Sequence, residues 1–284
     1  MTTIEHFLIS SIIKNNLNAH IISSDLYNKL KFYFIQYFKE HKTKKKSNLF
    51  FSLIGNFKLP YFKMGKINSS HLLGLDELII FSFYKKLKIL GYQKVADLGA
   101  NIGLHSVILG KLNYQVKAYE PDPNHVKQFK KNIKINKLKK IKLIEKAVDI
   151  KEGSVVYTKI LNNTTGSFIG NAKLKTSGPV KKFIVRTENI QNILKWAQII
   201  KMDIEGMEYK VIKTLVKKDI IGKIIILEIG TRTNAIGIFN HCKKNKIFIF
   251  SQKTGWKLAK EISELPFSHK EGSAILYYKN KFPI

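Results

Sequence analysis

The sequence predicts an α/β fold in which a doubly wound, mostly parallel sheet carries helices on both faces. Two observations lead to this prediction. Short apolar segments alternate with amphipathic segments of helical period over residues 94–250, a rhythm typical of successive β–α–β units. In addition, residues 95–103 (VADLGANIG) join an apolar strand to a helix through a glycine-containing turn. Such a turn allows a ligand to approach the backbone beside the free N–H groups of a helix N-terminus.

We expect an N-terminal extension over residues 1–70 and the main domain over 71–284. Helices are predicted over 4–13 and 24–39, the second capped by Ser24, followed by the basic run KTKKK. The second helix repeats apolar residues every four positions, at Leu26, Leu30, Phe34 and Phe38. This apolar face could rest on a membrane surface or cover the main domain, and we expect the cover helix.

The main domain is expected to start with a helix over 75–90, ended by Gly91 at C′. Residues 150–192 break the alternation, with short strands near 155–157 and 183–185 around a polar loop, 162–167. Beyond these, we expect strands at 94–98, 114–119, 141–148, 199–204, 223–229, 246–250 and 273–278, and helices at 103–112, 123–136, 207–217 and 234–245.

Composition excludes several classes of protein. The chain has 284 residues, 44% of them hydrophobic, and it contains no run of 18 apolar residues and no secretory signal pattern, so we expect no membrane span. Its single cysteine, Cys242, rules out an internal disulfide and a cysteine-rich zinc site. A reducing, cytoplasmic setting is therefore expected.

The formal charge of +30 suggests a polyanion as partner, but the kind of residue argues against a dedicated nucleic-acid site. Only Arg186 and Arg232 are arginines, so 48 of the 50 basic residues are lysines spread along the chain. Proteins that recognise the phosphates and bases of nucleic acids usually do so through arginine, whose planar guanidinium group can donate two parallel hydrogen bonds. We therefore predict solvated lysine faces and no specific nucleic acid, with weak attraction to anionic surfaces.

The segment after the glycine turn narrows the choice of nucleotide. Glu120 ends the second strand 21 positions after Gly99, where many β–α–β units place a carboxylate on ribose hydroxyls. An exposed strand-end acid is the alternative. A dinucleotide fingerprint starting at Gly99 would need glycine at positions 101 and 104, which hold Asn101 and Leu104. The pattern D-x-G-x-N-x-G instead resembles the first motif of S-adenosylmethionine-dependent methyltransferases.

Several further blocks occur in order over about residues 90–230: DLGANIG (97–103), YEPDP (119–123), EKAVD (145–149), NNTTGSF (162–168), KMDIEGMEYKVIK (201–213) and LEIG (227–230). Together they resemble the FkbM family of S-adenosylmethionine-dependent methyltransferases. The resemblance implies a class I, Rossmann-like methyltransferase fold, with a seven-stranded sheet whose last strand is antiparallel. It also implies S-adenosyl-L-methionine as cofactor.

The resemblance also implies roles for individual residues. Asp97 would face the ammonium group of the cofactor through water or a backbone N–H, and Glu120 would accept hydrogen bonds from both ribose hydroxyls. Ala147 and Val148 would flank the adenine from the third strand, although ordinary core positions are an equal alternative. The residues shaping the turn beneath the methionine part would be Gly99, Asn101 and Gly103.

The reaction expected is O-methylation of a hydroxyl on a sugar, glycan or small-molecule acceptor, which needs a base. Asp203 is the first candidate and Glu205 the second. Glu208, three residues after Glu205, could share its helix face. His105 is expected to be packed and neutral, and Glu228 to lie beside the pocket. No metal is predicted.

Two other functions remain open from the sequence. An RNA or protein methyltransferase would suit the high charge, but no target-binding module is recognisable. A dinucleotide-dependent oxidoreductase is opposed by Asn101 and Leu104.

Overall fold

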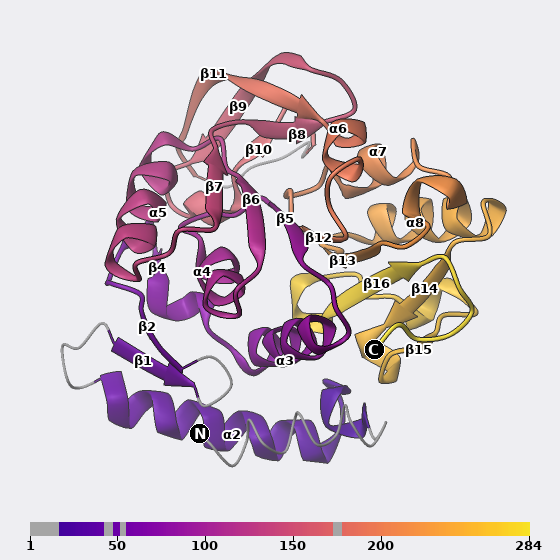
Figure 1. Cartoon of the computed structure of the whole chain (residues 1–284), viewed down its shortest axis with the longest axis horizontal. Helices are drawn as coiled ribbons and strands as arrows, with labels where there is room; N and C mark the ends of the chain where they lie inside the picture. Colours follow the sequence, from indigo (N-terminus) through magenta and orange to yellow (C-terminus); the bar gives the residue numbers. More distant parts are fainter. Residues whose placement is uncertain (1–16, 43–47, 52–54, 173–177) are drawn as a thin grey trace.

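The structure is a computed structural model that describes residues 17–42, 48–51, 55–172 and 178–284. Its centre is a large sheet (Figure 1). The strands follow one another in the order β15 (Lys257–Leu258), β14 (Phe248–Ser251), β16 (Ser273–Tyr277), β13 (Ile224–Glu228), β12 (Ile199–Met202), β5 (Lys94–Leu98), β6 (Gln115–Tyr119) and β7 (Ile141–Ile144).

The direction of the strands gives the fold class. From β13 through β12, β5 and β6 to β7 every pair is parallel, whereas β16 is antiparallel to both β13 and β14. The strand order reverses between β5 and β12, and ligands of doubly wound sheets bind at such a switch point. This is the predicted class I methyltransferase arrangement of seven strands, and the two-residue β15 extends it at one edge.

Helices cover both faces of the sheet, as its buried, β-branched strands require. One face packs α3 (Leu75–Ile89), α4 (Leu104–Lys111) and α5 (Pro123–Ile135) into one hydrophobic core. The opposite face packs α6 (Ile190–Leu194), α7 (Glu208–Ile212) and α8 (Arg232–Lys244) into a second core. The sequence predicted all of these helices except α6. The expected helix 207–217 is shorter: α7 ends at Ile212, a turn follows, and Lys217 already belongs to a separate 3₁₀ turn, η4 (Lys217–Ile220).

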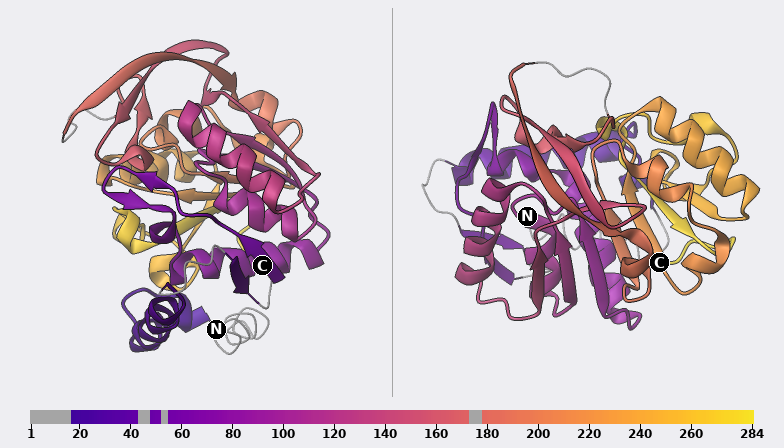
Figure 2. Two further views of the ribbon diagram at one scale, coloured as in Figure 1. Left: turned by 90° about the vertical axis from the view of Figure 1, so that its left-hand side faces the viewer. Right: turned by 90° about the horizontal axis from the view of Figure 1, so that it is seen from above.

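A second, smaller sheet lies across the carboxyl ends of the main strands, at the top of Figure 1 and arching over the core in Figure 2. Its order is β10 (Phe168–Ile169), β9 (Gly153–Ile160), β11 (Val180–Asn189) and β8 (Ala147–Asp149). The polar loop predicted over 162–167 connects β9 to β10 and contains the 3₁₀ turn η3 (Thr164–Gly166).

The prediction of a single strand over 141–148 is wrong. The main-sheet strand β7 ends at Ile144, where the N–H of Lys146 donates to the carbonyl of Ile144 at 2.8 Å and turns the chain. β8 then pairs in parallel with β11 in the small sheet, with Ala147 opposite Thr187. The polar pair Glu145–Lys146 lies at the break, but nothing in this segment alone shows that β8 pairs with a strand of another sheet.

The N-terminal part begins with the 3₁₀ turn η1 (Leu17–His20) and α2 (Asp25–Lys42), which runs along the bottom of Figure 1. The predicted cap is confirmed, because Ser24 Oγ accepts from the N–H of Tyr27 at 3.1 Å. The chain then forms the hairpins β1 (Asn48–Phe51) with β2 (Gly55–Lys58) and β3 (Lys63–Met64) with β4 (Ile67–Asn68). The helix expected over 4–13 lies outside the described residues.

The expected face of α2 is partly wrong. Tyr27 and Phe34 are buried, but Leu26 is exposed, so the inner face follows positions 27, 30 and 34. The Tyr27 hydroxyl donates to Asp76 Oδ2 on α3 at 2.7 Å, and Trp256 Nε1 donates to His20 Nδ1 at 3.0 Å. Residues from η1 and α2 thus share the core of the main domain, as a cover helix should. The boundary expected at residue 70 stays a prediction.

Truncating the docking contact should destabilise the protein. Tyr27 is 1% exposed, so Tyr27→Ala is expected to lower the free energy of unfolding by about 3–5 kcal/mol, the cost of removing a buried aromatic ring. Tyr33, in the same helix, is 63% exposed, and Tyr33→Ala should change it by less than about 0.5 kcal/mol. Urea denaturation measures both, and equal effects would contradict a docked α2.

Candidate active site

A pocket of about 510 Å³ opens at the carboxyl ends of the main strands, between the large sheet, the small sheet and the start of α3. This volume lies within the range of small-molecule sites. Seven of the predicted site residues line it: Gly99, Asn101, Glu120, Ala147, Val148, Asp203 and Glu205.

The floor of the pocket is the turn after β5. Its N–H groups at Gly99 and Ala100 donate to the carbonyl of Tyr119 on β6, at 3.1 and 3.0 Å. Gly99 has φ +75°, and a Cβ there would lie 1.8 Å from the carbonyl oxygen of Asp203. Asn101 also has positive φ, at +54°, a conformation that asparagine tolerates better than most residues. The D-x-G-x-N-x-G pattern therefore reflects close backbone contact between neighbouring turns.

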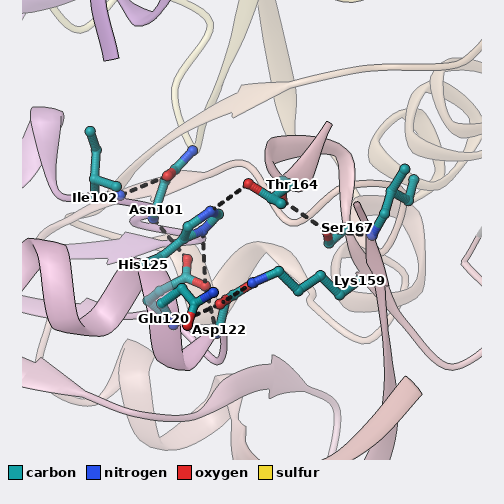
Figure 3. Close-up of polar contacts among 10 residues, drawn as sticks. Asn101, Ile102, Glu120, Asp122, His125, Lys159, Thr164 and Ser167 are labelled. Atoms are coloured by element: carbon teal, nitrogen blue, oxygen red, sulfur yellow. Dashed lines mark hydrogen bonds and ion pairs between the residues drawn. The ribbon is translucent and has the colours of Figure 1, made fainter. Parts of the chain in front are cut away.

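Glu120 links this turn to the next one (Figure 3). Its carboxylate accepts from the N–H of Asn101 and from the N–H of Asp122, both at 2.8 Å. Each bond uses a different oxygen, so each oxygen keeps a lone pair for another donor. The side chain is buried, yet Glu120 lines the pocket. It is an anchored acceptor rather than the exposed strand-end acid that the sequence left open.

Two contacts tie the small sheet to this corner (Figure 3). His125 Nε2 and Thr164 Oγ1 are hydrogen-bonded at 2.8 Å, which connects the start of α5 with η3. Lys159 on β9 forms a buried ion pair with Asp122, with Nζ 2.7 Å from Oδ2. Both contacts position the polar loop at the pocket, which it lines.

Asp97 and Gly103 are not among the residues that line the pocket. Gly103 is the N-cap of α4 with φ +84°, packed where a Cβ would lie 2.1 Å from the ring of Phe129. Asp97 is fully buried and accepts from Ser106 Oγ at 2.6 Å. Its other oxygen, Oδ1, has no hydrogen-bond partner among the described residues.

Ala147 and Val148 form the wall at the end of the pocket nearest the small sheet. They come from β8, not from the third strand of the main sheet as predicted. Because the chain turns after Ile144, these two residues are carried over the carboxyl end of the sheet instead of ending a strand within it. Both are apolar and buried, which suits the face of an aromatic base.

Asp203 follows β12 and also lines the pocket. Its Oδ2 pairs with Lys201 Nζ at 3.0 Å. Burial opposes a charge on Lys201, but four carboxylates, Asp203, Asp97, Glu228 and Glu77, raise the pKa of its ammonium group. Lys201 is therefore held as a cation within a ring of acids. Glu228, at the end of β13, also lines the pocket, as expected.

Glu208 stabilises the loop after Asp203 through hydrogen bonds to its backbone. Glu205 has φ +54° and Gly206 has φ +105°, and this tight turn exposes N–H groups. The Glu208 carboxylate accepts from the N–H of Ile204 and of Gly206, each at 3.0 Å, and from Asn234 Nδ2 at 2.8 Å. The expectation that Glu205 and Glu208 share a face is wrong, because Glu208 turns inward and is buried while Glu205 lines the pocket.

The contribution of α3 to the pocket was not predicted from the sequence. Glu77, in its first turn, accepts from His105 Nε2 at 2.7 Å, and both residues line the pocket. Tyr84 OH lies 2.9 Å from His105 Nδ1. Burial raises the pKa of Tyr84 well above its ordinary value, so Tyr84 presents a neutral hydroxyl to this ring. His105 is thus packed between Tyr84 and Glu77.

The acid pair Asp76–Glu77 could not be recognised as part of a site from the chain alone. Acids in the first turn of a helix commonly complement its dipole, and nothing in their spacing distinguishes that role. Asp76 also lines the pocket while holding Tyr27 and Gln252. Only the packing of α3 beside β5 and β12 brings both acids to the glycine turn.

The model of the methyltransferase FkbM domain matches residues 97–253, more than half of the chain. This chain belongs to the FkbM methyltransferase family. It is an S-adenosylmethionine-dependent methyltransferase, and the sequence-based expectations of family, fold class and cofactor are confirmed. Asp76 and Glu77 precede the matched region. No curated protein matches the chain.

Solved methyltransferases share a weak structural likeness. A ribosomal protein L11 methylase from Lactobacillus delbrueckii subsp. bulgaricus has 12% identity and a TM-score of 0.34, covering 60% of this chain and 67% of its own. A precorrin-6y C5,15-methyltransferase from Geobacter metallireducens GS-15 has 13% identity and a TM-score of 0.38, covering 69% and 85%. An rRNA methylase from Streptococcus thermophilus has 11% identity and a TM-score of 0.33, covering 66% and 86%. Likenesses of this size do not bear on the acceptor.

The pocket has features that suit the cofactor of this family. The glycine turn has no room for side-chain atoms at position 99, so its backbone stays accessible. The remaining lone pairs of Glu120 supply acceptors in the pocket, whereas the unpaired oxygen of Asp97 is buried and does not line it. Within the described part of the chain, no cluster of three histidine, cysteine or acidic residues could hold a metal ion. None of the described helices is long and apolar enough to span a membrane.

Glu208 should make stability depend on pH. Burial raises its pKa to about 7 from 4.5, so the fold favours the protonated form. The contribution of Glu208 to the free energy of unfolding is therefore fully present below pH 4.5. It falls by about 3 kcal/mol as pH rises through about 7. Glu208→Gln cannot ionise and should lack this loss.

Urea denaturation of both proteins at several pH values between 4.5 and 7 measures the effect. Glu208→Gln also alters hydrogen bonds, which shifts the free energy of unfolding by an amount that does not depend on pH. The test therefore compares how the difference in free energy between the two proteins changes with pH. A difference that stays constant across this range would show that Glu208 keeps an ordinary pKa.

Proposed function

We propose that this methyltransferase methylates a hydroxyl group of a sugar, glycan or other small-molecule acceptor. The observation that supports this most directly is the carboxylate pair Asp203 and Glu205 in the lining of the pocket. An aliphatic hydroxyl has a high pKa, so its methylation needs a proton acceptor at the reacting end. These two carboxylates supply that group.

The proposed cofactor contacts follow the shape of the pocket. Glu120 accepts hydrogen bonds from the ribose hydroxyls, while Ala147 and Val148 cover one face of the adenine. The turn of Gly99, Asn101 and Gly103 carries the methionine part, whose ammonium group faces Asp97 through water or a backbone N–H. S-adenosylmethionine supplies a methyl group already activated on a sulfonium centre. The protein then has to align the acceptor, exclude water and remove a proton.

Asp203 is the proposed base and Glu205 its alternate. Lys201 cannot take the proton, because the surrounding carboxylates keep it protonated. Its ion pair with Asp203 instead fixes that carboxylate at the pocket wall. The acceptor hydroxyl would pass its proton to Asp203 as its oxygen takes the methyl group. Incubation with methyl-labelled cofactor and candidate sugars or cell extracts, followed by mass analysis of the product, tests the reaction. A label found only on amines or RNA would overturn the proposal.

Removing the ribose anchor should weaken cofactor binding. Glu120→Ala is expected to reduce the affinity for S-adenosylhomocysteine by about 1–3 kcal/mol, the usual cost of losing a charged hydrogen-bond partner. Isothermal titration calorimetry measures the change. Glu145→Ala is a suitable control, since Glu145 is exposed and pairs with Lys130 away from the pocket. Unchanged affinity in Glu120→Ala would remove this residue from the site.

Neutralising the proposed base should act on turnover rather than on binding. Asp203→Asn keeps the shape of the side chain but not its basicity, and a general base typically contributes about 10²–10⁴-fold. We expect kcat to fall by at least about 10²-fold, with cofactor affinity within about threefold of wild type. A melting temperature close to wild type would show that the fold is intact. A fully active variant would rule out Asp203 as the base.

A further inference from the structure

Charge is strongly segregated between the pocket and the rest of the chain. The protein has 50 basic and 20 acidic residues. Among the described aspartates, glutamates and lysines that line the pocket, however, six are acidic and one is basic. The six acids are Asp76, Glu77, Glu120, Asp203, Glu205 and Glu228, and the cation is Lys201. Nearly a third of the acidic residues therefore face one hollow in a basic protein.

Most of these acids lie away from the adenine end. Glu120 is the proposed ribose anchor, while Asp76, Glu77, Asp203 and Glu228 come from the start of α3 and the ends of β12 and β13. If the ribose lies at Glu120 and the adenine at Ala147 and Val148, the methionine part extends toward these acids. We call Glu77, Asp203 and Glu228, which together surround Lys201, the acidic wall.

Glu77 is the member of the acidic wall best placed to act through its charge. Its side chain is 31% exposed, at the pocket, and is held by His105 Nε2. Tyr84 OH lies 2.9 Å from Nδ1 of the same ring, so the ring that holds Glu77 is itself fixed by a buried partner. Burial opposes a charge on Glu77, but His105 and Lys201 hold the pKa of Glu77 below its ordinary value. The carboxylate is therefore ionised at neutral pH.

We propose that the acidic wall, through Glu77 in particular, makes this pocket select the charge on the cofactor sulfur, binding the sulfonium form more tightly than the neutral thioether. S-adenosylmethionine carries one more positive charge than S-adenosylhomocysteine, and the two are otherwise nearly alike. Methyl transfer breaks the bond between sulfur and the methyl carbon, forms the bond from that carbon to the acceptor oxygen, and leaves the electron pair on sulfur. The attraction to the wall then ends, which favours release of the product. This inference rests on the cofactor placement of the proposed function.

Three ligands that differ at one position test the proposal by isothermal titration calorimetry: S-adenosylmethionine, S-adenosylhomocysteine and sinefungin, which bears an amine where the sulfonium would be. Glu77→Gln retains an oxygen that accepts from His105 but removes the charge. We expect about tenfold weaker binding of both cationic ligands and less than about twofold change for S-adenosylhomocysteine. Glu145→Gln makes the same charge change on the exposed surface and should alter none of the three.

Glu228→Gln is a second variant that should give the same pattern, in case Glu77→Gln does not fold. Equal weakening of all three ligands, or no change in any, in whichever variant folds, would overturn the proposal, because charge at sulfur would then not be recognised. Glu120→Ala distinguishes a failure of the proposed cofactor placement from a failure of the proposed charge selection. If it weakens all three ligands equally, the cofactor placement stands even when the charge selection fails. If it weakens none, the placement itself is wrong.

Discussion

The contact on which this site depends is the one between two turns, after β5 and after β12. The backbone at Gly99 lies so close to the carbonyl of Asp203 that a Cβ would be 1.8 Å from that oxygen. Because neighbouring parallel strands are about 4.8 Å apart, only a residue without a side chain allows both turns to curl over the same edge. This contact sets the distance between the glycine turn after β5 and the acids that follow β12.

Beside that contact, one buried cation is surrounded by carboxylates. Lys201 lies on β12 beside Asp97 on β5, and its ammonium group is surrounded by carboxylates from four elements. Isolated burial of a cation would be costly, but here paired acids offset it. The same arrangement gives the pocket an acidic character opposite to that of the whole molecule. High lysine content therefore describes the outer surface and says little about what the pocket binds.

The small sheet and α3 complete a site that the central sheet could not enclose alone. β8 carries Ala147 and Val148 over one end, and η3 is fastened through Thr164 to His125. At the other end the first turn of α3 brings Glu77 against His105. These walls come from segments on either side of the nucleotide-binding strands in the chain, so the pocket unites residues that are far apart in sequence.

The sequence by itself determined the strand and helix alternation, the glycine turn and the acids at the ends of β6, β12 and β13. These features are local: a buried strand is mostly apolar, a left-handed turn favours glycine or asparagine, and a strand-end acid follows its strand directly. The tertiary structure decided the break of strand 141–148, the inward turn of Glu208 and the arrival of Glu77 at the pocket. Each of these depends on a partner distant in the chain, namely β11, Asn234 and His105. The pattern of apolar residues within one segment does not specify which distant residue that segment will contact.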